Sequence, residues 1–168
     1  MSPEARLLAL LGEGGVLKIA TAESCTGGNV AARLTSVAGS SAYVQGGIVS
    51  YSNEAKASLL GVPQRVLDTE GAVSAACALA MAEGARRACN AGMAVSTTGI
   101  AGPTGATERK PVGLVYIALS VGDHASVEEH HFSGDRAAVT AAATERALRL
   151  LVWGAEEALG HDHHARHA

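Results

Sequence analysis

The chain has 168 residues, a length that fits one domain able to bury a hydrophobic core. Hydrophobic residues make up 48% of it, which argues against a disordered chain, and no apolar run reaches the roughly 20 residues that a membrane helix needs. Thirteen basic and sixteen acidic residues give a net charge of −3 with no basic block, and 3% of the residues are aromatic. Nucleic acid is therefore not an expected partner, because its binders show a basic surface and often aromatic platforms.

The N-terminus lacks the basic start and cleavage site of a signal peptide, so we expect a cytoplasmic protein without a membrane partner. Cys25, Cys77 and Cys89 lack the close pairing of a zinc or redox motif, which agrees with a reducing compartment. His130 and His131 have no third ligand at metal spacing, so no metal site is expected.

The first half of the chain predicts two strands, each followed by a helix. Leucines between 7 and 11 indicate a first helix, and the apolar run 16–22 indicates a strand that leads through a glycine turn into a helix over 30–34. A second strand is expected over 44–51. Ser52 or Asn53 should cap the helix that follows it and ends at residue 60.

The second half predicts a further helix, a strand, a hairpin and a last helix. The expected elements are a helix over 74–90 capped by its first serine, a strand over 93–98, hairpin strands over 112–121 and 125–132, and a helix over 135–159. Strands that alternate with helices predict a layered α/β fold, and the hairpin makes its sheet mixed. Ligands of such folds bind at the carboxyl ends of strands, where three polar loops occur here.

The turn after the first strand presents Ser24 between strand and helix. Free N–H groups near Thr26, Gly27 and Gly28 would suit a phosphate or the oxyanion of an acyl-transfer intermediate. For an isolated turn, capping of the helix by Ser24 or Thr26 is the commoner use. Cys25 is a rival nucleophile whose activating partner the sequence does not show.

The segment after the second strand offers a candidate base. Lys56 would lie in or near the first turn of a helix, where the helix dipole disfavours a cation and burial would lower the pKa of its amine further. Such a lysine can deprotonate a serine, as in known Ser-Lys pairs, and Tyr51 could hold the lysine or donate a proton. The alternative is a solvated surface lysine, which most lysines are.

The third candidate is the loop over 97–105, in which Gly99, Gly102 and Gly105 recur at every third position. Its N–H groups can cradle a phosphate, although an ordinary flexible turn is the commoner form of a single glycine loop. Arg136 follows Asp135, the expected cap of the last helix, and can either reach an anionic ligand or remain solvated.

Taken together, these segments resemble the CinA C-terminal family of nicotinamide-nucleotide amidohydrolases. The resemblance covers about residues 5–159 and rests on motifs that occur in the family's order: Ala22–Gly28, Gly46–Lys56, Gly71–Ser74, Thr98–Pro103, Lys110–Gly113 and Gly134–Arg136. Several long motifs in a fixed order are far more specific than any one of them.

The resemblance implies one domain over 1–160, folded as a three-layer α/β/α sandwich with a mixed, mostly parallel sheet, and a polar His-rich tail over 161–168. It implies deamidation of nicotinamide mononucleotide to nicotinate mononucleotide and ammonia without a cofactor. The implied catalytic residues are Ser24, Lys56 and Tyr51. The implied substrate-binding residues are Thr26, Gly27, Gly28, Thr98, Gly99, Ala101, Gly102 and Arg136.

Two other functions stay open at this point. A phosphate-binding regulatory module could use the same glycine loops without chemistry, and an amidase or esterase could act on another small amide. We also expect a homodimer, since many small enzymes are symmetric dimers.

Overall fold

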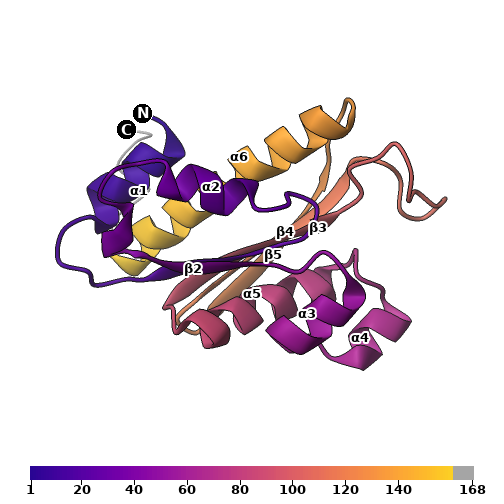
Figure 1. The fold of residues 1–168 in the computed structure, drawn as a ribbon, viewed down its shortest axis with the longest axis horizontal. Helices are drawn as coiled ribbons and strands as arrows, with labels where there is room; N and C mark the ends of the chain where they lie inside the picture. The colour runs from indigo at the N-terminus through magenta and orange to yellow at the C-terminus, as the bar shows by residue number, and fades with distance from the viewer. Residues whose placement is uncertain (161–168) are drawn as a thin grey trace.

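A computed structural model describes residues 1–160 of the chain, and the tail expected over 161–168 lies outside the described residues (Figure 1). The centre of the fold is a five-stranded sheet in the order β2-β1-β3-β4-β5. The strands are β1 (Ile19–Glu23), β2 (Val44–Val49), β3 (Met93–Gly99), β4 (Leu114–Val121) and β5 (His124–His131).

The sheet is mixed, as predicted. β1 pairs in parallel with β2 and with β3, whereas β4 is antiparallel to β3 and β5 is antiparallel to β4. Because β5 reverses direction again, four of the five strands point the same way. The hairpin between β4 and β5 turns at Gly122 and Asp123, where the sequence placed it.

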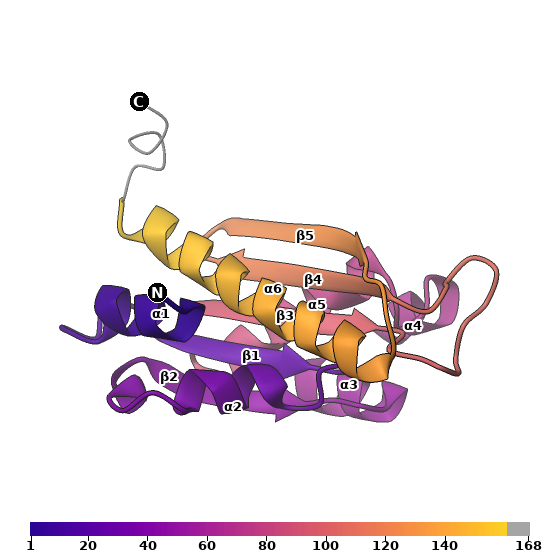
Figure 2. The same ribbon diagram turned by 90° about the horizontal axis from the view of Figure 1, so that it is seen from above.

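Helices cover both faces of the sheet and complete the predicted three-layer α/β/α sandwich (Figures 1 and 2). One face carries α1 (Pro3–Leu11), α2 (Asn29–Thr35) and α6 (Arg136–Ala158). The other face carries α3 (Asn53–Leu60), α4 (Gln64–Thr69) and α5 (Ala75–Cys89). No helix among the described residues is both long and apolar enough to cross a membrane.

The register of the central strands places three loops side by side. Glu23, the last residue of β1, is paired with Val49 on one side and with Thr97 on the other. β1 is buried along its whole length, because it is a central, mostly apolar strand covered by helices on both faces. The loops that follow β1, β2 and β3 therefore leave the sheet at one edge.

Side-chain caps fix where three of the helices begin. Ser52 accepts a hydrogen bond from the N–H of Ala55 at 3.0 Å, Ser74 caps α5, and Asp135 caps α6. These caps confirm the predicted starts. The short helix α4 was not predicted, because Gly61-Val62-Pro63 is typical of a helix stop and six residues show little periodicity.

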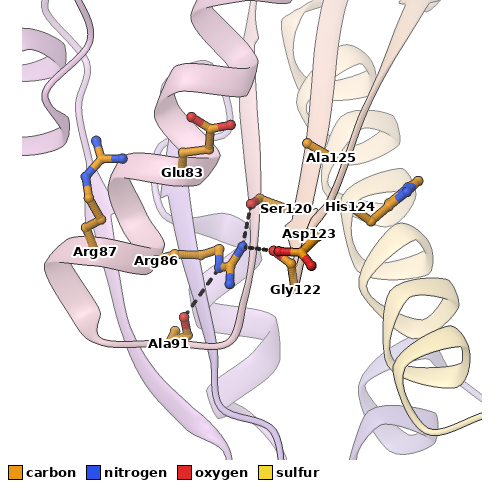
Figure 3. A pocket seen from close by; sticks show the side chains of 9 residues that line it. All are labelled: Glu83, Arg86, Arg87, Ala91, Ser120, Gly122, Asp123, His124 and Ala125. Carbon is orange, nitrogen blue, oxygen red and sulfur yellow. Dashed lines mark hydrogen bonds between the residues drawn. The ribbon is translucent and has the colours of Figure 1, made fainter.

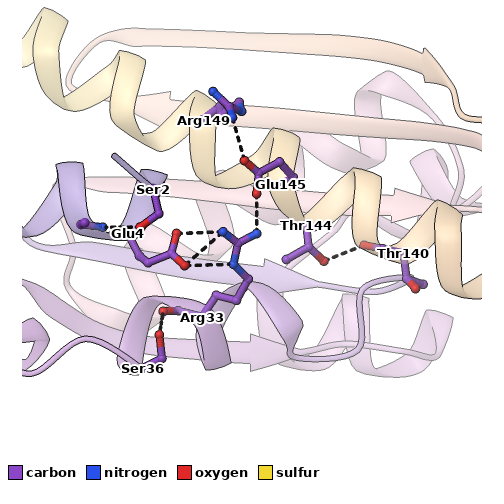
Figure 4. Close-up of polar contacts among 9 residues, drawn as sticks. Ser2, Glu4, Arg33, Ser36, Thr140, Thr144, Glu145 and Arg149 are labelled. Carbon is purple, nitrogen blue, oxygen red and sulfur yellow. Dashed lines mark hydrogen bonds and ion pairs between the residues drawn. The ribbon is translucent and has the colours of Figure 1, made fainter.

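Polar contacts tie together the helices of the first face (Figure 4). Arg33 of α2 forms ion pairs with Glu4 of α1 at 2.8 Å and with Glu145 of α6 at 2.5 Å. Partly exposed pairs of this kind contribute only about 0–1 kcal/mol each. The apolar layer beneath them, which includes Leu7 and Leu148, therefore holds this face together.

We expect Gly84→Ala to destabilise the fold by about 1–3 kcal/mol, because α5 and the end of α3 are in close contact at this position. A Cβ atom at Gly84 would lie 2.0 Å from the carbonyl oxygen of Leu60. This overlap should outweigh the helix propensity of alanine, which favours the substitution by about 1 kcal/mol. Urea unfolding measures the difference.

The matched control is Ala88→Gly, at an exposed position of the same helix. It changes helix propensity alone and should cost about 0.5–1 kcal/mol. A Gly84→Ala protein that is more stable than the wild type would contradict the predicted overlap.

Candidate active site

A pocket of about 310 Å³ opens at the sheet edge where β1, β2 and β3 end. Its position agrees with the predicted convergence of three loops. Eight of the predicted site residues line it, from four different segments: Ser24, Tyr51, Lys56, Thr98, Gly99, Ala101, Gly102 and Arg136. The structure thus brings together most of the residues that the sequence singled out separately.

Ser24 and Lys56 are in direct contact inside this pocket. The Nζ atom of Lys56 lies 2.9 Å from the Oγ atom of Ser24, within hydrogen-bond reach of a base and its nucleophile. The lysine is 2% exposed and the serine 8%, so the solvated surface lysine is excluded. Both side chains still border the pocket, where a ligand can reach the serine oxygen.

Lys56 is surrounded by oxygen atoms that carry no full charge. Besides Ser24 Oγ, its Nζ atom lies 2.8 Å from the carbonyl oxygen of Ser50 and 3.4 Å from that of Tyr51. Among the described residues, Lys56 forms no ion pair with a carboxylate. Burial lowers the pKa of the Lys56 amine, whereas nearby Cys77 and Cys25 act weakly in the opposite direction.

These three partners match the hydrogen-bonding capacity of a neutral amine. A neutral amine has two N–H donors, which the carbonyl oxygens of Ser50 and Tyr51 can accept, and one lone pair, to which the hydroxyl of Ser24 can donate. An ammonium group with three donors would be satisfied by the same three oxygen atoms, so these contacts admit both forms of the lysine. Burial is what favours the neutral amine, which can take up the proton of Ser24.

Tyr51 and Arg136 lie together at the mouth of the pocket. Arg136 donates one hydrogen bond to the Tyr51 hydroxyl at 2.9 Å and another to the carbonyl oxygen of Gly102 at 2.8 Å. Tyr51 is 62% exposed, and its hydroxyl faces this arginine. Its backbone carbonyl is the part of Tyr51 that contacts Lys56.

The wall opposite Ser24 comes from the glycine loop after β3. Thr98 donates its hydroxyl to the carbonyl oxygen of Ala72 at 2.8 Å, which fixes the segment before α5 against β3. Gly99 is required for close packing, because a Cβ atom there would lie 2.7 Å from the carbonyl oxygen of Leu114. Ile100 and Asn53 also line the pocket, although neither was among the predicted site residues.

Thr26, Gly27 and Gly28 are not among the residues that line the pocket. Thr26 is 2% exposed and donates its hydroxyl to Glu23, and the N–H of Gly27 donates to the carbonyl oxygen of Ser24. The N–H groups of Val30 and Ala31, at the start of α2, also donate to Glu23. The expected anion site at this helix start is therefore already filled by the protein's own carboxylate.

Glu23 had no predicted role, although it lies within the first motif, Ala22–Gly28. A carboxylate at the end of a mostly apolar strand was the available signal, since such a group must be satisfied when it is buried.

Lys110, the first residue of the motif Lys110–Gly113, and His130 lie outside the pocket. Lys110 donates to the carbonyl oxygen of Glu70, and His130 bonds with Glu128 and stacks on Phe132. Within residues 1–160, no group of three or more potential ligand side chains could hold a metal ion.

A second pocket, of about 390 Å³, lies at the opposite end of the sheet (Figure 3). Arg86 occupies its centre and donates to the hydroxyl of Ser120 at 3.0 Å and to the carbonyl oxygen of Gly122 at 2.9 Å. The arginine thereby joins the end of α5 to the β4–β5 hairpin. This pocket contains no nucleophile beside a base, so we place the candidate site at the other end.

Known proteins share this fold and much of this sequence. One similar solved structure is that of the competence/damage inducible protein CihA from Agrobacterium tumefaciens, whose sequence is 42% identical. The match covers 90% of this chain and 92% of the CihA chain, with a TM-score of 0.87. A CinA superfamily protein from Klebsiella pneumoniae is 34% identical, with coverage of 92% and 96% and a TM-score of 0.87.

Curated relatives are longer than this chain. A CinA-like protein from Geobacter sp. (strain M21) is 53% identical over 146 residues, which are 87% of this chain and 35% of that protein. The chain thus spans about a third of the length of such relatives. The model of the CinA C-terminal domain matches residues 3–153, and the chain belongs to the CinA C-terminal domain family.

Proposed function

We propose that this protein is a serine amidohydrolase that converts nicotinamide mononucleotide into nicotinate mononucleotide and ammonia. The observation that carries the proposal is the 2.9 Å contact between the buried Lys56 amine and the Ser24 hydroxyl at the wall of an open pocket. Membership of the CinA C-terminal domain family supports it, because the sequence resembles the family's nicotinamide-nucleotide amidohydrolases at both residues.

In the first half of the proposed reaction, Lys56 takes the proton of Ser24 while the serine oxygen bonds to the carboxamide carbon of the nicotinamide ring. The negative charge moves to the carboxamide oxygen. The N–H of Cys25 directly follows the nucleophile, donates to no other residue among those described, and can stabilise this oxyanion. The protonated Lys56 then gives its proton to the amide nitrogen, the C–N bond breaks, and ammonia leaves.

In the second half, water hydrolyses the ester on Ser24. Lys56 takes a proton from the attacking water, hydroxide bonds to the acyl carbon, and the returned proton restores the Ser24 hydroxyl as the bond to the serine oxygen breaks. The acid product leaves and loses its remaining proton to solvent. Each half therefore uses the same lysine first as a base and then as an acid.

Arg136 is our candidate for the phosphate of the substrate. A guanidinium has five N–H donors, and two of those of Arg136 are engaged, with Tyr51 and Gly102. The remaining donors are exposed at the pocket mouth and suit a phosphate. Phosphate binding by Arg136 at the mouth would leave the carboxamide free to reach Ser24 in the same pocket.

We expect Ser24→Ala to lower ammonia release from nicotinamide mononucleotide by at least about 1000-fold, because the variant has no oxygen to attack the amide. Binding of the mononucleotide, measured by calorimetry, should persist. The control is Ser126→Ala on β5, which should keep wild-type activity. Full activity of Ser24→Ala would sink the proposal, and a wild type that binds without turnover would favour a regulatory module.

We expect kcat/KM to rise with pH along a limb whose midpoint lies below 10.5, the ordinary pKa of a lysine, because only the neutral amine of Lys56 accepts the serine proton. Burial disfavours the charged form, so the shift of the Lys56 pKa is downward. Lys56→Arg should be inactive at every pH, since a guanidinium stays protonated. A limb whose midpoint lies at or above 10.5 would contradict this role.

The rival nucleophile is predicted to be unreactive. Burial raises the pKa of the Cys25 thiol to about 11, so at pH 8 it holds about 100-fold less thiolate than an ordinary cysteine. Iodoacetamide should label the half-exposed Cys89 of the native protein faster than Cys25, as read by peptide mass spectrometry. Unfolded protein, in which all three cysteines react, is the control. Preferential labelling of Cys25 would restore it as the nucleophile.

A further inference from the structure

We propose that Glu23 is a positioning residue of this site, whose buried carboxylate holds the turn that carries Ser24 at a fixed place beside Lys56. The inference rests on the proposed function in one respect, namely that Ser24 is the nucleophile. It adds a residue that touches neither the substrate nor the reacting atoms.

Glu23 is a buried carboxylate bound by neutral donors. It is 1% exposed, and among the described residues it forms no ion pair. Its Oε1 atom accepts from the Thr26 hydroxyl at 2.6 Å and from the N–H of Val30 at 2.8 Å, and its Oε2 atom accepts from the N–H of Ala31 at 3.1 Å. Burying a carboxylate without a cation is costly, so its retention at this position needs a reason.

Part of that reason is the start of α2. The helix begins after Gly28, which offers no side-chain cap. Glu23 supplies the missing acceptors from the neighbouring strand, and its negative charge lies at the positive end of the helix dipole. Strand and helix are thereby joined across the turn that contains Ser24.

The carboxylate also fixes the direction of a hydroxyl chain. An ionised Glu23 can only accept, so the Thr26 hydroxyl must donate its hydrogen to Glu23. The hydroxyl of Thr97, 2.7 Å from that of Thr26, must then be the donor in their shared bond. Thr97 lies on β3, so the chain Glu23–Thr26–Thr97 connects the turn to the next strand.

The same residues hold the nucleophile and the base. The N–H of Ser24 donates to the carbonyl oxygen of Thr97 at 3.0 Å. On the other side, the N–H of Ser50 donates to the carbonyl oxygen of Glu23 at 2.8 Å, and Lys56 donates to the carbonyl oxygen of Ser50. Glu23 therefore lies in the network that sets the Ser24–Lys56 distance.

Glutamine cannot replace this carboxylate. Its amide has one acceptor oxygen, whereas three donors converge on Glu23 from two sides. In either orientation of the amide, at least one N–H at the start of α2, that of Val30 or the partly buried one of Ala31, faces a second donor and loses its partner. We expect the turn to shift, and a displacement near 1 Å at a reacting group can slow a reaction by about 100-fold.

The test compares wild type, Glu23→Gln and the matched control Glu83→Gln, which changes an exposed glutamate of α5 at the far end of the sheet. One readout is the kcat and KM of nicotinamide mononucleotide deamidation. The second is the rate at which an alkyl fluorophosphonate modifies Ser24, located by peptide mass spectrometry. In that reaction the serine oxygen bonds to phosphorus, fluoride leaves, and the hydroxyl proton passes to Lys56.

For Glu23→Gln we expect kcat and the modification rate to fall by about 10- to 100-fold, with KM within about threefold of wild type. Glu83→Gln should match the wild type in both. The second pair of variants is Thr26→Val, which removes the donor hydroxyl and should slow both reactions, and Thr26→Ser, which keeps it and should restore them. This pair tests the network even if Glu23→Gln does not fold.

A folded Glu23→Gln protein with wild-type rates would overturn the inference, even if its melting temperature falls. A lower melting temperature at unchanged rates would show that Glu23 only stabilises the fold. Thr26→Val raising KM at unchanged kcat would also overturn it. A wild type that modifies Ser24 but does not deamidate the mononucleotide refutes the proposed substrate, and the modification rates still decide on Glu23. A wild type that does neither overturns both proposals.

Discussion

The site depends on the burial of one amine among uncharged oxygen atoms. Lys56 is 2% exposed, and its Nζ atom contacts the Ser24 hydroxyl and two backbone carbonyl oxygens. Burial without a nearby carboxylate disfavours the ammonium form, so it lowers the pKa of the amine. The same burial that makes this lysine unusual is what lets it act as a base toward the serine.

The architecture supplies this burial at a sheet edge. β1 and β3 are parallel neighbours, so Ser24 and the loop after β3 leave the sheet side by side. β2 is the parallel neighbour of β1 on its other side, and the segment after β2 brings Lys56 to Ser24. Glu23 stiffens the junction by joining β1 to the start of α2. A rigid strand-turn-helix unit is a suitable support for a nucleophile, because catalysis requires its geometry to be fixed before substrate binds.

Much of the fold could be predicted from local signals in the sequence, but the site only in part. Asp135 as a cap and the turn at Gly122 follow from short-range chemistry and were predicted. Ser24 and Lys56 are 32 residues apart in the chain. Local reasoning left a catalytic and a solvated lysine as alternatives, and the family resemblance favoured the catalytic one. Only the structure shows that the lysine is buried beside the serine. The binding role expected of Thr26 stays a prediction, and only the tertiary structure shows that its hydroxyl donates to Glu23.

The most direct measurement of the central claim is the pKa of Lys56 itself. The chain has three lysines, so a protein labelled with ¹³C at the lysine ε-carbon gives a simple spectrum, and Lys56→Arg assigns the signal. The account predicts that the Lys56 signal titrates with a midpoint below 10.5, the ordinary value for a lysine. A midpoint at or above 10.5 would leave Lys56 an ammonium ion at working pH and would contradict its assignment as the base.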